Sequence, residues 1–273
     1  IGGFCSSESL AAVPIATVNK IVLFSASSSS PDLTNISKYF FRNYPSDASQ
    51  GAVLAQIAFD KGYKKIAFIQ EQLDYPLGIF KAFDNKFKEL GGSIVKEEFA
   101  TSVTDFRSQL LKLKVEAPNA LFIDSQTPAV SQRILRQLGQ SEWKPPLFLT
   151  DATIGDSETL QKYSGQLEGA MGAEFGVDLN NSKFKSLSES YKQKYNTDLP
   201  YASYAQTEYD VVYMLRDAIN ENGYNPSKIV EWVRSVKDWS GASGLVIIGA
   251  DGDRVGGHVA KVVKNGKVEL YIK

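Results

Sequence analysis

The stretch KIAFIQEQLDYPLGIFKAFDNKFKELGGSIVKEEF, residues 65–99, decides the fold class. It predicts a short apolar strand at 65–70, an amphipathic helix at about 76–90 and a second strand at 93–99. Two glycines lie just past the helix, where the backbone must accept a left-handed conformation. A strand, a helix and a strand in this order predict a right-handed βαβ unit with two parallel strands.

The same alternation extends on both sides of this stretch. The other predicted strands lie at 21–26, 120–125 and 145–150, and the other predicted helices at about 48–61, 105–115 and 128–139. Strands that alternate with helices in this way predict an α/β fold with a parallel sheet covered on both faces.

The pattern changes after residue 176. Helices are predicted at about 181–195, 201–221 and 226–237, followed by three short strands. Turns are expected at Asp251-Gly252 and Asn265-Gly266, and Asn-Gly between alternating apolar residues is among the strongest hairpin signals.

Composition excludes several classes of protein. The 273 residues are enough for two α/β domains or one large domain. The 30 Lys and Arg are interspersed with 31 Asp and Glu, so we expect no nucleic-acid partner. No apolar run approaches the roughly 20 residues of a membrane span. One Cys and one His leave little for a metal site, and we expect no metal and no cofactor.

Two serine-rich segments are the most informative local feature. SASSSSP (25–31) directly follows a predicted strand, at the edge of an open α/β sheet where ligands bind. Short hydroxyl side chains and free backbone N–H groups suit a carboxylate or another anion. GGFCSSES (2–9) has the same form, which favours a shared anion-binding crevice. A solvated serine loop without a ligand is the alternative.

Catalytic motifs are missing from the sequence. It contains no GxSxG, HExxH, GxxxxGK[ST], CxxC or GxGxxG. Ser182 to Lys185 matches SxxK, but its partner motifs are absent. His258 is interpreted as structural, and the DGD at 251–253 as a turn instead of a calcium site. We therefore expect no catalytic residues and no enzyme activity.

The run LPYASYAQTEYD (199–210) is rich in tyrosine. Tyr201, Tyr204 and Tyr209 cannot all share one helix face with Tyr213, so at least one is expected to face solvent or ligand. Plain helix packing is the alternative.

Six segments together resemble the leucine/isoleucine/valine-binding protein family of type I periplasmic binding proteins. They occur in the family's order and spacing: GGFCSSESLAAVPIA, SASSSSPDLT, YFFRNYPSDASQGAVLA, KIAFIQEQLDYPLGI, TDFRSQLLKLK and YAQTEYDVVYML. The resemblance implies two Rossmann-like lobes joined by a hinge of three crossing strands, with the ligand held between them. It implies a first lobe of residues 1–45 and 177–245 and a second lobe of 46–176 and 246–273.

The resemblance also implies the ligand-binding residues. Ser6 and Ser29 match positions that hold the ligand carboxylate through hydroxyls and backbone N–H groups. Ser27 matches the position whose carbonyl accepts from the ligand ammonium, and Tyr204 matches a wall of the side-chain pocket.

Two further residues are implied for the second lobe. Asp151 matches the acidic partner of the ammonium, and Tyr75 matches the aromatic residue that closes over the ligand. The set is physically coherent, because a zwitterion can lose its hydration only where both of its charges are paired.

The chain departs from the family in two ways. The family normally has Thr at the position of Ser29. Members of the family also begin with further βα units that this sequence lacks, on the order of 60 residues or two βα steps. We therefore expect the first lobe to be incomplete here and the precursor to carry these units before Ile1. The resemblance implies a partner for Cys5 within them, and a buried unpaired thiol is the alternative.

The function expected from the resemblance is capture of a small amino-acid-like ligand, branched-chain amino acids first, for the membrane permease of an ABC transporter. The protein would then be periplasmic, or extracellular and anchored to the cell surface. A sensor domain of the same fold and an α/β enzyme acting on an amino-acid-like substrate are the competing hypotheses.

Overall fold

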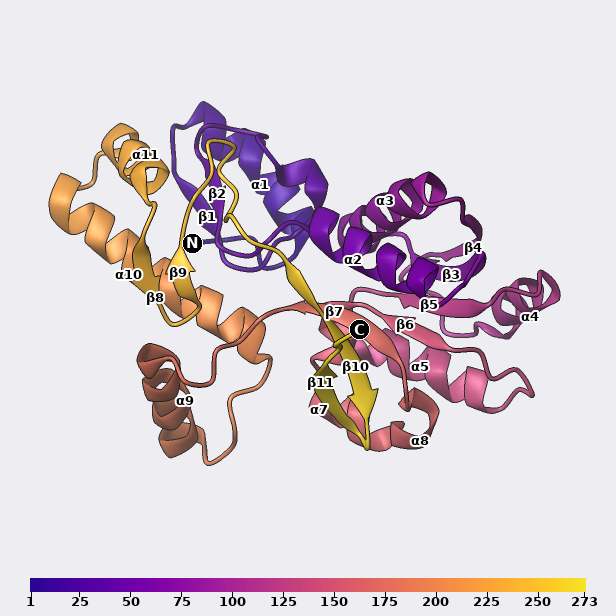
Figure 1. Ribbon diagram of the computed structural model, residues 1–273. Helices are drawn as coiled ribbons and strands as arrows, with labels where there is room; N and C mark the ends of the chain where they lie inside the picture. Colours follow the sequence, from indigo (N-terminus) through magenta and orange to yellow (C-terminus); the bar gives the residue numbers. More distant parts are fainter. The chain divides into compact units, whose positions relative to one another are not determined.

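The computed structural model describes residues 1–273, which form two compact units. Unit 1 comprises residues 1–46 and 175–257, and unit 2 comprises 47–174 and 258–273. The chain therefore passes between the units three times, after Ser46, Glu174 and Gly257. Each unit is described by itself below, with the labels of Figure 1.

Unit 2 is built on a seven-stranded sheet with the order β11-β10-β7-β6-β5-β3-β4. The strands are β3 (Lys65–Glu71), β4 (Ser93–Phe99), β5 (Ala120–Asp124), β6 (Leu147–Leu149), β7 (Met171–Phe175), β10 (His258–Lys264) and β11 (Lys267–Leu270). The neighbours from β4 to β7 pair in parallel, and β10 and β11 form an antiparallel hairpin. The predicted α/β fold with a mostly parallel sheet is thus confirmed.

Helices cover both faces of this sheet (Figure 1). On β5, Ala120 and Phe122 pack toward α2 (Asp47–Asp60) and α3 (Asp74–Glu89). Leu121 and Ile123 pack into the core on the other face. That second face is covered by α4 (Arg107–Val115), α5 (Pro128–Gly139), α6 (Asp151–Ile154), α7 (Ser157–Lys162) and α8 (Ser164–Leu167). Because successive side chains point to opposite faces, a strand buried on both sides is apolar at every position.

One glycine sets the spacing of the helices on the α2 face. A Cβ added at Gly51 of α2 would lie 2.6 Å from the Cβ of Ala82 and 2.6 Å from the backbone nitrogen of Phe83 on α3. Only glycine lets the two helix backbones approach this closely.

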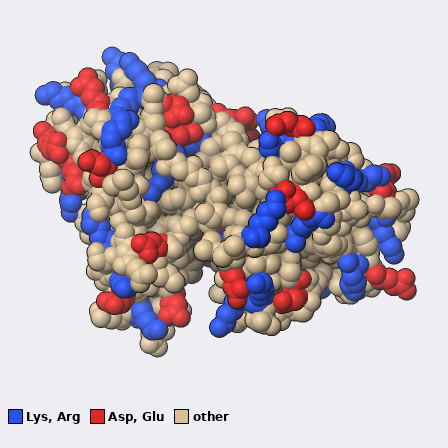
Figure 2. Space-filling model, in the orientation of Figure 1, with Lys and Arg blue, Asp and Glu red and all other residues tan.

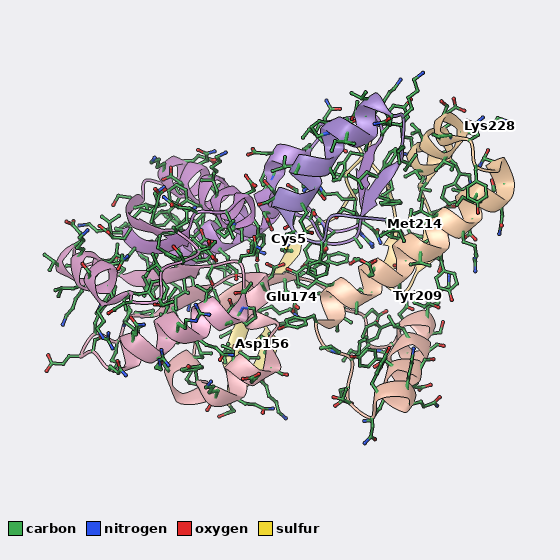
Figure 3. The ribbon with its side chains drawn as sticks, turned by 180° about the vertical axis from the view of Figure 1, so that it is seen from behind. Cys5, Asp156, Glu174, Tyr209, Met214 and Lys228 are labelled. Atoms are coloured by element: carbon green, nitrogen blue, oxygen red, sulfur yellow. The ribbon has the colours of Figure 1, made fainter.

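Unit 1 combines a small parallel pair of strands with four longer helices (Figure 1). Its elements are α1 (Ser6–Val18), β1 (Leu23–Ser25), the 3-10 turn η1 (Pro31–Leu33), β2 (Phe40–Arg42), α9 (Ser182–Tyr195), α10 (Ala202–Asn222), α11 (Pro226–Ser235), β8 (Trp239–Gly241) and β9 (Gly244–Val246). Phe24 of β1 and Phe41 of β2 pack against Met214 of α10 in a buried apolar cluster (Figure 3 labels Met214).

The C-terminal part of the chain differs from the sequence-based expectation. Residues 246–257, expected in the second lobe, belong to unit 1, because Arg42 pairs in a parallel bridge with Asp253 and accepts a backbone hydrogen bond from Arg254. The turn expected at Asp251-Gly252 is present, with positive φ at Gly252 and an antiparallel bridge between Ile248 and Arg254 around it. The strand β9, however, pairs with β8 and not with β10. The predicted Asn265-Gly266 turn joins β10 and β11, with positive φ at both residues.

Acidic and basic side chains are mixed over the face shown in Figure 2, without a large patch of one sign. None of the helices combines the length and the apolar character that crossing a membrane requires.

Candidate functional site

The two serine-rich segments of unit 1 pack directly against each other. The hydroxyls of Ser25 and Ser28 donate to the carbonyl of Gly3 over 2.7 and 2.8 Å, and the hydroxyl of Ser27 donates to the carbonyl of Phe4 over 2.9 Å. The side chains of residues 27–30 are buried, so this segment, hereafter the serine loop, is not a solvated loop.

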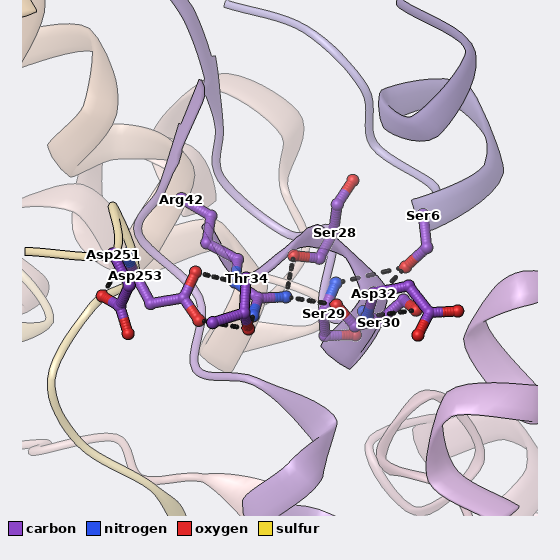
Figure 4. A network of polar contacts seen from close by, with 9 residues as sticks. All are labelled: Ser6, Ser28, Ser29, Ser30, Asp32, Thr34, Arg42, Asp251 and Asp253. Carbon is purple, nitrogen blue, oxygen red and sulfur yellow. Dashed lines mark hydrogen bonds and ion pairs between the residues drawn. The ribbon is translucent and has the colours of Figure 1, made fainter. Parts of the chain in front are cut away.

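Ser6 and Ser29, implied together by the resemblance, are in contact. Ser6 begins α1, and its hydroxyl oxygen accepts the backbone N–H groups of Ser29 (3.2 Å) and Ser30 (3.0 Å), as Figure 4 shows. A hydroxyl carries one donor and two acceptor sites, so Ser6 can still donate its own hydrogen. The N–H of Ser29, in contrast, is already used by its bond to Ser6.

Tyr204 lies in an aromatic group beside the first serine segment. Its ring stacks on Tyr44 with 4.6 Å between centroids, and its centroid lies 6.0 Å from that of Phe4. Tyr44 also meets Phe175 edge to face at 5.8 Å. Tyr201, which precedes α10, is 38% exposed, so the tyrosines of this run do not share one environment.

In unit 2, Tyr75 and Asp151 form a buried pair. Tyr75 lies in the first turn of α3, and Asp151 begins α6 shortly after β6. The phenol of Tyr75 donates to Oδ1 of Asp151. Burial, followed by the charges of Asp151 and Asp47, raises the pKa of Tyr75 well above its usual range. The phenol therefore remains a hydrogen-bond donor, and the carboxylate is its acceptor.

More buried polar groups lie at the carboxyl end of the same sheet. Gln70 and Asp124 are register partners at the ends of β3 and β5. Neither Gln70 nor Asp124 has a side-chain hydrogen-bond partner, and the amide of Gln50 on α2 has none either. Burial, followed by the charges of Asp47 and Glu71, raises the pKa of Asp124 well above its usual range.

The charge balance of the two units differs. The buried carboxylates of unit 2 are Asp47, Glu71, Asp124 and Asp151, and no Lys or Arg is buried in this unit. The resemblance implied Asp151, but the sequence did not reveal that it belongs to a group, because Asp124 reads there as the end of an apolar strand.

Asp124→Asn is expected to stabilise the protein at neutral pH and not at about pH 4. The pKa of Asp124 is higher in the folded chain than the value of about 3.9 in an unfolded chain. The unfolded chain therefore loses this proton first, and stability falls as the pH rises above about 4. Asparagine has no such proton, so at pH 7 the variant should be more stable, by about 1.4 kcal/mol for each unit by which folding raises the pKa of Asp124.

Urea unfolding at both pH values checks this result. Asp105→Asn, an exposed residue of the same unit, is the control and should show no such difference. Equal stability changes of the Asp124 variant at both pH values would contradict the expectation.

Comparison with known proteins gives the family. Residues 1–260 match the model of the family described as "receptor family ligand binding region". No match is found among curated protein sequences.

Solved structures agree with this match. A leucine-binding protein of Thermotoga maritima is 29% identical over 99% of this chain and 78% of its own, with a TM-score of 0.89. A branched-chain amino acid transporter substrate-binding protein of Streptococcus pneumoniae, solved with isoleucine, is 26% identical over 98% of this chain and 76% of its own, with a TM-score of 0.82. A solute-binding protein of Rhodopseudomonas palustris, solved with benzoate, shares the fold with 16% identity, a TM-score of 0.83, and coverage of 97% and 74%.

The family match spans nearly the whole chain, and the parallel sheet of unit 2 is the one that the resemblance implies. The chain belongs to the family of receptor ligand-binding regions and has the type I periplasmic binding protein fold.

Proposed function

We propose that this protein is the solute-binding component of an ABC transporter and that it binds a neutral amino acid, branched-chain amino acids first. The observation that carries the proposal is the buried Tyr75–Asp151 pair. A buried carboxylate that accepts a hydrogen bond is suited to bind the ammonium of an amino acid, because the two opposite charges compensate each other away from water.

Unit 1 supplies groups for the other end of the ligand. The hydroxyls of Ser6 and Ser29 would donate to the ligand carboxylate, and the carbonyl of Ser27 would accept from the ammonium. Ser6 is suited to this role because its two acceptor positions are already filled by the serine loop. Charge-assisted hydrogen bonds contribute roughly 1.5–3 kcal/mol each, so several of them support tight binding.

The ligand side chain would pack on the rings of Tyr204 and Phe4, and the fully buried Tyr44 would support Tyr204 by stacking on it. Such a surface favours an apolar side chain. The binding of leucine and isoleucine by similar proteins supports the same ligand class.

The proposed mechanism is hinge closure, in which unit 1 holds the ligand first and unit 2 follows. The three passages of the chain would act as the hinge. The partner is the membrane permease, and the place of action is the periplasm or, for a surface-anchored form, the cell exterior.

The family description also favours a second candidate, a sensor domain that passes closure to a signalling domain. A transmembrane segment or a helix-turn-helix encoded next to this chain in the full gene would favour the sensor.

Leucine, isoleucine and valine are expected to raise the melting temperature of the protein without being consumed. A ligand at 100 times its Kd stabilises the native state by about 2.7 kcal/mol. The measurement is thermal unfolding with a panel of amino acids, with benzoate as the anion without an ammonium, followed by recovery of the ligand.

A shift with benzoate and none with any amino acid would overturn the proposed function. Chemical conversion of the recovered ligand would instead favour the enzyme hypothesis.

A further inference from the structure

Arg42 at the end of β2 is fully buried and forms a bidentate ion pair. Its Nε donates to Oδ1 of Asp253 over 2.7 Å, and its Nη2 donates to Oδ2 over 2.6 Å (Figure 4). Such paired bonds fix the plane of the guanidinium group as well as its position.

The remaining donors of Arg42 hold another part of unit 1. Nη2 also donates to the hydroxyl of Thr34 over 2.9 Å, and Nη1 donates to the carbonyls of Ser30 (2.8 Å) and Ser28 (3.5 Å). A guanidinium has five N–H donors, and all five are accounted for. Two of them end on the backbone of the serine loop.

The serine loop is therefore held from two sides. Arg42 binds the carbonyls of Ser28 and Ser30, while Ser6 accepts the N–H groups of Ser29 and Ser30. The backbone between these contacts carries the hydroxyl of Ser29, and the carbonyl of Ser27 directly precedes them.

We propose that Arg42, oriented by Asp253, is a positioning residue for ligand binding. It touches no ligand itself but holds the serine loop in the conformation that binds the carboxylate. Binding is tighter when such a loop is already ordered, because the ligand does not have to order it. This inference rests on the proposed function, in which the serine loop binds the ligand.

Arg254 offers a matched control in the same unit. It is also buried, donates to Oδ1 of Asn43 over 2.9 Å and to the carbonyl of Leu245 over 3.2 Å, and lies over the ring of Phe175 at 4.6 Å. None of its hydrogen bonds reaches the serine loop. Replacement of either arginine is thus expected to lower folding stability. Only replacement of Arg42 is expected to loosen the serine loop as well.

The experiment compares Arg42→Lys with Arg254→Lys in the full chain. Lysine keeps the charge but has three donors instead of five and lacks the planar fork that binds Asp253 with two bonds. Calorimetry with L-leucine should show at least a tenfold higher Kd for Arg42→Lys and less than a threefold change for Arg254→Lys. Urea unfolding of both variants measures the loss of stability.

A second readout needs no ligand. Amide hydrogen exchange at Ser29 and Ser30 in the ligand-free protein should become at least tenfold faster in Arg42→Lys and stay unchanged in Arg254→Lys. If no amino acid binds the parent protein, the proposed function fails, while this exchange still tests whether Arg42 holds the loop.

Equal changes in Kd for the two variants, or unchanged exchange in Arg42→Lys, would overturn the inference. If Arg42→Lys does not fold, the variant Thr34→Val takes its place in both measurements. Valine removes one acceptor of Arg42 and also the hydroxyl that donates to Oδ2 of Asp253 over 2.8 Å. It should raise Kd about threefold to tenfold, a factor of ten being about 1.4 kcal/mol. Thr34→Val without any effect on Kd and exchange would then decide against the proposal.

Discussion

Asp151→Asn is expected to weaken the binding of L-leucine by about 2–5 kcal/mol, because the buried ammonium of the ligand would lose its counter-charge. Asp151 is fully buried and accepts a hydrogen bond from Tyr75. Asparagine keeps the size of the side chain and can still accept from the phenol, so the fold should persist while the charge is lost. Calorimetry on the parent protein and the variant measures the difference.

Asp156→Asn is the matched control. Asp156, which Figure 3 labels, is half-buried and caps α7 by accepting the N–H of Thr159 over 2.9 Å. Asparagine caps a helix about as well as aspartate, so this variant should keep both stability and affinity. Equal small effects on affinity at Asp151 and Asp156 would rule out the ammonium role.

Phe122→Ala is expected to lower the free energy of unfolding by about 3–5 kcal/mol, the range for truncating a buried phenylalanine. Phe122 has no exposed surface and stacks on Phe68 with 4.5 Å between ring centroids. It also meets Phe83 edge to face at 5.7 Å and lies 6.1 Å from Phe148. The cavity would open between the rings of Phe68, Phe83 and Phe148. We expect that these three rings cannot all move into the space that the ring of Phe122 leaves.

Urea unfolding followed by circular dichroism measures this loss. Leu111→Ala on α4 is the control, since Leu111 is 62% exposed and its truncation should change stability by less than about 0.5 kcal/mol. A loss of under about 1 kcal/mol at Phe122 would show that the aromatic core of unit 2 closes around the gap.

Local patterns predicted the elements of unit 2 well. The helix expected at 128–139 has these bounds in the structure, and the strand expected at 65–70 ends one residue later. Both signals are local, because a strand buried on two faces is continuously apolar and a covering helix is apolar on one face.

Three strands were not predicted. The strand β7 has the sequence MGAEF, without a β-branched residue, and Gly172 lies against Ile154 so closely that an added Cβ would be 2.5 Å from its Cδ1. The strands β2 and β8 have three residues each, too few to show a period. Their pairing is decided by the packing of distant segments.

The features of the candidate site also divide into those that the sequence predicted and those that it did not. The serine loop was visible because it directly follows a strand. The bonds between Arg42 and Asp253 join residues 211 positions apart, and no local pattern contains them. The surroundings of Asp124 come from α2 and β3, so its burial beside other carboxylates was equally hidden.

Under the proposed function, the buried carboxylates of unit 2 would also determine which ligands this protein does not bind. A like charge placed beside a buried charge costs several kcal/mol, and unit 2 has no buried Lys or Arg to offset it. An aromatic acid such as benzoate, bound by a protein of the same fold, brings a negative charge and no ammonium. Under the proposed function, repulsion by Asp151 would therefore exclude such acids, and discrimination between ligands would depend as much on rejection as on attraction.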